Sequence, residues 1–89
     1  MILTVEISMY PFTTSYLPSI DAFLEHLTTQ KGIKIKINAL STQIQGEGTA
    51  VFNAIQSGVE AYFGGDHKGV FVMKVLPGHI DLEYRRQEG

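Results

Sequence analysis

Residues 2–11 read ILTVEISMYP, and apolar and polar side chains alternate along them. A repeat of two residues indicates a β-strand with one buried face, because successive side chains of a strand point to opposite sides. Pro11 has no backbone N–H to donate, so we expect the strand to end there. The face expected in the core carries Leu3, Val5, Ile7 and Met9, and the opposite face carries Thr4, Glu6, Ser8 and Tyr10.

The segment after this strand has a different apolar spacing. Intervals of three and four residues predict an amphipathic helix, whose apolar residues are Leu17, Ile20, Phe23, Leu24 and Leu27. Alternation returns in residues 33–38, which predicts a second strand. Residues 41–45 follow a tight corner at Ala39 and Leu40, and we expect them to pair antiparallel with that strand.

A second helix is predicted after Gly46 and Gly48. Its apolar residues, again three and four apart, are Phe52, Ile55, Val59, Tyr62 and Phe63. Residues 70–76 then form a strongly apolar strand that ends at Pro77. A final alternation of Ile80, Leu82 and Tyr84 predicts either an edge strand or an arm that lies on a partner chain.

The predicted elements follow one another in the order β-α-β-β-α-β, with a short strand after them. A chain of 89 residues can bury one core, so residues 1–89 are expected to fold as a single domain. In so small a chain this order predicts an α+β, ferredoxin-like fold, with an antiparallel sheet and both helices on one face. The first strand then lies between the third and the fourth. The far face of the sheet is either wet or covered by another molecule.

The composition excludes several classes of function. The net charge of −2 offers nothing to attract the backbone of a nucleic acid. Cysteine is absent, which excludes disulfides, thiolate metal sites and thiol nucleophiles. The apolar runs are too short to span a membrane, and no basic segment of a signal peptide precedes the first strand, so we expect a cytoplasmic location.

The sequence contains no recognisable catalytic or metal-binding motif. Its three histidines are placed in a helix, a loop and a turn, without the spacing of metal ligands. Ser41 and Thr42 have no histidine nearby in the sequence that could activate a hydroxyl group as a nucleophile. We therefore predict that the protein is not an enzyme and that it has no metal site and no cofactor.

The sheet face away from the helices has a mixed character. Its polar patch is expected to contain Glu6, Ser8, Tyr10, Ser41, Gln43 and Lys74. Val70, Val72 and Leu76 make the same face too apolar for a surface that meets only water. Two sheets packed face to face around a polar small molecule would cover the apolar side chains and give the polar ones partners. The plainer alternative is a solvated or simply dimeric face, in which Glu6 and Lys74 form a cross-strand ion pair.

Two segments resemble motifs of a known family. Ile7-Ser8-Met9-Tyr10-Pro11-Phe12 is similar to the Ser-Leu-Tyr-Pro-type segment of the YkoF-like thiamine-binding family, and Leu40-Ser41-Thr42-Gln43-Ile44-Gln45-Gly46 is similar to its Ile-Ser-Thr-x-x-x-Gly segment. The resemblance extends from about Thr4 to Leu76. Some members carry two such repeats in one chain, and this sequence carries one.

The resemblance implies a ferredoxin-like protein that binds thiamine or its hydroxymethylpyrimidine moiety without transforming it. A single repeat implies self-association, as a dimer or a tetramer, to complete the site and cover the sheets. The motifs assign ligand binding to Ser8, Tyr10, Ser41 and Thr42, and the flanking Glu6 and Asn38 are our additions. Ala39 stands where some members have an acidic residue, so thiamine, the free pyrimidine and phosphate esters all remain open as ligands.

A second hypothesis comes from a different class of protein. The same mixed sheet face would suit a regulatory or scaffolding module that oligomerises and binds no ligand. Both hypotheses predict self-association. Only the first predicts that thiamine raises the unfolding midpoint, because a ligand stabilises a fold only by binding the folded state.

Overall fold

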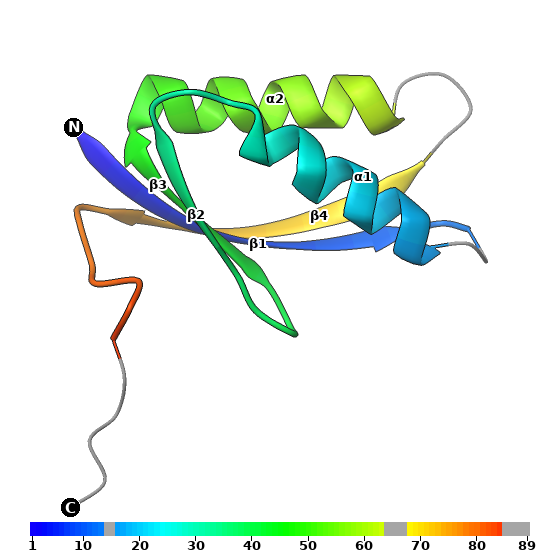
Figure 1. The fold of residues 1–89 in the computed structure, drawn as a ribbon, viewed down its shortest axis with the longest axis horizontal. Helices are drawn as coiled ribbons and strands as arrows, with labels where there is room; N and C mark the ends of the chain where they lie inside the picture. The colour runs from blue at the N-terminus through cyan, green and yellow to red at the C-terminus, as the bar shows by residue number, and fades with distance from the viewer. Residues whose placement is uncertain (14–15, 64–67, 85–89) are drawn as a thin grey trace, which may run out of the picture.

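The computed structural model of the protein describes residues 1–13, 16–63 and 68–84. The elements are β1 (Ile2–Pro11), α1 (Tyr16–Thr28), β2 (Ile33–Ile37), β3 (Thr42–Glu47), α2 (Gly48–Phe63) and β4 (Gly69–Pro77). The β-α-β-β-α-β order is the one predicted from the sequence. Figure 1 shows both helices on one side of the sheet, which confirms the α+β, ferredoxin-like fold.

The sheet has four strands in the order β2-β3-β1-β4, and each neighbouring pair is antiparallel. β1 therefore lies between β3 and β4, as expected. Glu6 is opposite Lys74 on β4, and Ser8 is opposite Val72. Directly opposed residues of an antiparallel pair point to the same face, so the apolar side chains of Val70, Val72 and Leu76 share the open face with Glu6 and Ser8.

The core lies between the sheet and the two helices. Val5 and Ile7 of β1 are buried there, as predicted, together with Ile44 of β3. The helices contribute Phe23, Leu27, Val51, Ala54 and Ile55. This core fixes the direction of each strand residue, because every side chain next to a core residue in a strand must point to the open face.

Two apolar residues assigned to the helix stripes are exposed. Leu17 of α1 is 60% exposed and Phe52 of α2 is 42% exposed. In α2 the buried residues are Val51, Ala54, Ile55 and Gly58. The helix begins at Gly48, directly after β3, and this connection sets which side of the helix meets the sheet. That side includes the small residues Ala54 and Gly58, and the ring of Phe23 packs against Gly58.

Residues 78–84 do not form an edge strand, the first of the two alternatives predicted for this segment. Thr4 Oγ1 donates to the Gly78 carbonyl at 2.9 Å, and Gln45 Nε2 donates to the Ile80 carbonyl at 2.7 Å. Glu83 forms an ion pair with Lys36 at 3.1 Å. All three anchoring side chains lie on the open face, so this segment covers one end of that face within its own chain, and Thr4 and Gln45 are buried as a result.

Candidate functional site

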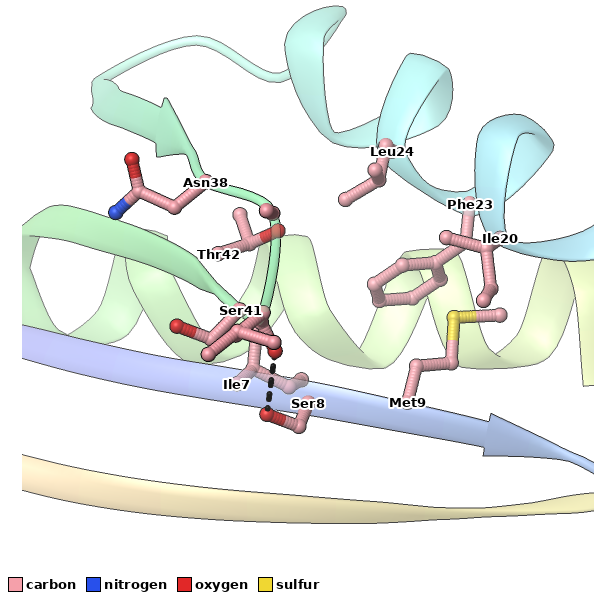
Figure 2. Close-up of a pocket in the computed structure, with 11 residues that line it drawn as sticks. Ile7, Ser8, Met9, Ile20, Phe23, Leu24, Asn38, Ser41 and Thr42 are labelled. Carbon is pink, nitrogen blue, oxygen red and sulfur yellow. Dashed lines mark hydrogen bonds between the residues drawn. The ribbon is translucent and has the colours of Figure 1, made fainter. Parts of the chain in front are cut away.

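A cavity lies where β1 extends beyond β3. The pairing of β1 with β3 ends at Ile7 and Thr42, whereas its pairing with β4 continues to Pro11 and Gly69. Among the described residues, the end of β1 therefore has a strand on one side only. Helix α1 and the corner between β2 and β3 enclose the space on the other side, whose volume is about 120 Å³ (Figure 2).

The walls of this cavity divide into an apolar and a polar part. The apolar part consists of Ile7, Met9, Ile20, Phe23, Leu24, Ala39 and Leu40. The polar part consists of Ser8, Asn38, Ser41 and Thr42. An enclosed apolar cavity of about 150 Å³ can hold one benzene molecule, so this partly open space of about 120 Å³ is comparable in size to a single six-membered aromatic ring. The cavity offers such a ring apolar surfaces together with several hydrogen-bonding groups.

Four of the six site residues named from the sequence line the cavity, namely Ser8, Asn38, Ser41 and Thr42. Ser41 and Thr42 reach it from different sides. Thr42 is 5% exposed and lies opposite Ile7, on the helix side of the sheet. Ser41, the preceding residue, bonds with side chains of the open face, because neighbouring residues of an extended chain point to opposite sides.

A chain of hydrogen bonds connects the corner to Glu6 on the open face. Asn38 Nδ2 donates to Gln43 Oε1 at 2.9 Å, and Gln43 Nε2 donates to Ser41 Oγ at 3.0 Å. Ser41 Oγ donates to Glu6 Oε2 at 3.2 Å. Glu6 does not line the cavity, but this chain places its carboxylate one hydrogen bond away from a residue that does.

Glu6 also faces Lys74 across the strands, with 3.7 Å between Oε1 and Nζ. The Lys74 side chain is 83% exposed, so solvent screens the pair and it contributes at most about 1 kcal/mol to stability. A cationic group of a ligand that reached Glu6 would therefore compete only with a weak ion pair to Lys74.

Tyr10 stands apart from the other five residues. It is 56% exposed on the open face, opposite Val70, and does not line the cavity. The sequence placed the ligand on the open face, where Tyr10 would stack on it. The cavity lies at the end of the sheet, where the open face and the helix side meet, and Tyr10 is not part of its lining.

Several cavity residues were not named as site residues from the sequence. Gln43 does not line the cavity, but it forms hydrogen bonds with Asn38 and Ser41, which do. It was placed in the polar patch, and its alternation with Ser41 could have added it to the site. Met9 and Phe23 were assigned to the core. Their spacing is that of ordinary core residues, and nothing in it reveals that β3 ends before it reaches Met9.

The described residues contain no group of three histidine, aspartate or glutamate side chains that could hold a metal ion. Among the same residues, no helix has both the length and the apolar character needed to cross a membrane. The cavity lining offers the hydroxyl groups of Ser8, Ser41 and Thr42 and the amide of Asn38, and the carboxylate of Glu6 lies nearby.

Comparison with known families supports a relation to thiamine. Residues 5–77 match the model of the thiamine-binding protein family. The chain belongs to this family. The match confirms the resemblance seen in the two sequence motifs and includes every residue that lines the cavity. The family's name describes binding rather than catalysis.

Solved structures show the same fold at low sequence identity. A protein of Streptococcus pneumoniae has a TM-score of 0.78 at 18% identity, over 90% of each chain. A Thermotoga maritima protein, named as a putative thiamine biosynthesis/salvage protein, has a TM-score of 0.76 at 18% identity, over 93% of this chain and 92% of its own. A hypothetical protein of Methanocaldococcus jannascii has a TM-score of 0.71 at 16% identity, over 99% and 84%. No protein with a curated description matches the chain.

Proposed function

We propose that this protein binds thiamine or its hydroxymethylpyrimidine moiety without transforming it, and that a second copy of the chain completes the site. The observation that carries the proposal is the one-ring cavity with a polar margin, in a chain of the thiamine-binding protein family. The pyrimidine ring occupies the cavity. The ring lies under α1 at the end of β1, where Phe23, Ile20 and Met9 supply apolar contacts.

The polar margin of the cavity suits the edge of that ring. An aminopyrimidine carries an amino group that donates hydrogen bonds and ring nitrogens that accept them. Ser8, Ser41 and Thr42 have hydroxyl groups that can do either, and the Asn38 amide has both functions. These side chains come from β1 and from the corner between β2 and β3, so they approach the ring from different directions.

The remainder of thiamine lies outside the cavity, because a volume of about 120 Å³ does not hold a second ring. The hydrogen bond from Ser41 to Glu6 connects the cavity to the open face. The thiazolium ring of thiamine is a cation, and Glu6 is the carboxylate at the end of that connection. An interaction between these charges would compete with the screened pair of Glu6 and Lys74.

The proposal includes self-association through the open face. Tyr10, Val70, Val72 and Leu76 are each between 44% and 56% exposed there. Neutral hydrogen bonds contribute only about 0.5–1.5 kcal/mol each, so much of the affinity must come from removing the ligand from water. A second copy on the open face would cover these residues and the protruding part of the ligand, and it would bring Tyr10 against that part. The assembly is a dimer or a tetramer.

The second candidate function is a ligand-free regulatory or scaffolding module. The exposed apolar residues of the open face favour it as much as they favour a ligand-binding oligomer. The cavity and its polar margin have no role in such a module, and this is the reason for preferring the binding function.

Isothermal titration calorimetry and thermal unfolding with thiamine, its phosphate esters and hydroxymethylpyrimidine test the proposal. We expect thiamine and the free pyrimidine to bind and to raise the unfolding midpoint, since both carry the ring that fits the cavity. Light scattering on the same samples gives the mass of the assembly. An oligomer that shows neither heat of binding nor a shift with any of these compounds would establish the scaffolding function instead.

A further inference from the structure

The direction of each backbone group in β1 follows from hydrogen bonds at the strand ends. Gly78 N–H donates to the Ile2 carbonyl, and Phe12 N–H donates to the Lys68 carbonyl. Both bonds continue the register of β1 with β4. Because hydrogen-bonded pairs alternate along an antiparallel ladder, every even-numbered residue of β1 directs its N–H and C=O toward β4.

The odd-numbered residues of β1 direct these groups toward β3. Gly48 N–H donates to the Met1 carbonyl, in register with the pairing of β1 and β3, and this agrees with the alternation. The recorded pairing ends at Ile7 and Thr42, and the same register extended by two residues leads from Met9 to Leu40, which lies in the corner before β3 begins. Among the described residues, no backbone hydrogen bond joins Met9 to this corner.

Met9 therefore presents a free N–H and a free C=O side by side at the wall of the cavity. An unpaired donor and acceptor in a partly enclosed site favour a molecule that can satisfy both. A 4-aminopyrimidine has the matching pattern on one edge, since a ring nitrogen that accepts lies next to an amino group that donates. Figure 2 shows Met9 below the side chains of Ile20 and Phe23, which would cover the face of a ring held in this way.

We infer that the main chain of Met9 reads the donor and acceptor pattern of the ligand's pyrimidine edge. The inference rests on the proposed function and adds the group that determines specificity. The ligand class is then six-membered aromatic rings with an amino group next to an accepting nitrogen. Ser8, Asn38, Ser41 and Thr42 position the ring, while the two backbone groups select it.

Amide hydrogen exchange measured by NMR tests this assignment directly. Ser8 and Tyr10 are matched controls, because their N–H groups bond to β4 on either side of Met9. Without ligand, the Met9 amide should exchange at least tenfold faster than these two. Saturation with hydroxymethylpyrimidine should slow Met9 at least tenfold and leave the controls nearly unchanged. A bound ligand that leaves the exchange of Met9 fast would overturn the inference.

Ligand analogues separate this inference from the proposed function. The analogue without the 4-amino group leaves the Met9 carbonyl unpaired and should bind about ten- to a hundredfold more weakly than the parent pyrimidine. The 4-oxo analogue has the reversed pattern and should lose a similar factor. Equal affinity for all three compounds would refute the role of Met9 while the binding function stands. Absence of binding by all three would refute the binding function itself.

Discussion

Ser41 connects the cavity to the open face of the sheet. Its hydroxyl accepts a hydrogen bond from Gln43 and donates one to Glu6, and the residue also lines the cavity. A serine suits this position because one hydroxyl can donate and accept at the same time. Without this hydroxyl, the Glu6 carboxylate and the Gln43 amide would form hydrogen bonds with water, because both side chains are partly exposed.

Replacement of Ser41 by alanine should therefore affect binding more than stability. We expect the dissociation constant for thiamine to rise about three- to tenfold, the equivalent of one lost hydrogen bond. The free energy of unfolding should change by less than about 1 kcal/mol, since the neighbouring polar groups remain hydrated. Calorimetry and urea denaturation measure the two quantities. Ser19→Ala removes a hydroxyl from α1 outside the cavity and is the control, and equal affinities of the two variants would contradict the role of Ser41.

At the scale of elements, the packing of α1 on α2 holds one wall of the cavity in place. Phe23 of α1 is 1% exposed and lines the cavity, and its ring lies over Gly58 of α2. A Cβ atom at residue 58 would be 2.6 Å from Cε2 of Phe23, well inside van der Waals contact. Glycine at this position lets the two helices approach each other closely enough for the ring to lie between them.

Gly58→Ala should destabilise the protein. Inside a helix, alanine stabilises a protein by roughly 0.5–1 kcal/mol relative to glycine, but overpacking of a core costs about 1–3 kcal/mol. The clash with Phe23 therefore outweighs the gain in helix stability. We expect a net loss of about 1–2 kcal/mol in the free energy of unfolding by urea denaturation. The same substitution in a Phe23→Leu background should cost less, because leucine leaves room for the new methyl group. An equal cost in both backgrounds would exclude this contact as the cause.

At the scale of the whole molecule, the two ends of the open face differ. The segment 78–84 covers the end that contains Thr4 and Gln45. The other end leaves Tyr10, Val70 and Val72 exposed, and it adjoins the cavity through Ser8. The chain thus covers part of its open face by itself, around Thr4 and Gln45, and leaves uncovered the end next to the candidate site.

Val72→Lys should disrupt self-association. Val72 is 53% exposed on the open face beside Ser8, and a lysine there would place a charge in the proposed contact between copies. Light scattering should show a mass close to that of one chain, and calorimetry should show weaker thiamine binding because the enclosure is lost. Phe52→Lys changes a similarly exposed apolar residue on α2 and should keep the oligomer. An unchanged mass for Val72→Lys, or a monomeric native protein, would contradict association through this face.

Much of the candidate site could be predicted because it depends on strand periodicity. The alternation of residues 2–11 placed Glu6, Ser8 and Tyr10 on the open face, and the register with β4 agrees. The hydrogen bonds among Asn38, Gln43 and Ser41 follow from a short corner between two paired strands. The cavity could not be predicted, because it depends on how far β3 extends along β1 and on where α1 lies above them.

The amino-acid sequence by itself determined the order of the elements and the face on which the residues of β1 lie, because both follow from local repeats of polarity. The tertiary structure decided which side of α2 meets the sheet, since Phe52 and Val51 are adjacent and equally apolar. It also decided that residues 78–84 fold back over Thr4 and Gln45. Finally, it left the backbone groups of Met9 unpaired at the cavity wall. Each of these outcomes depends on contacts between segments far apart in the chain, which no local repeat specifies.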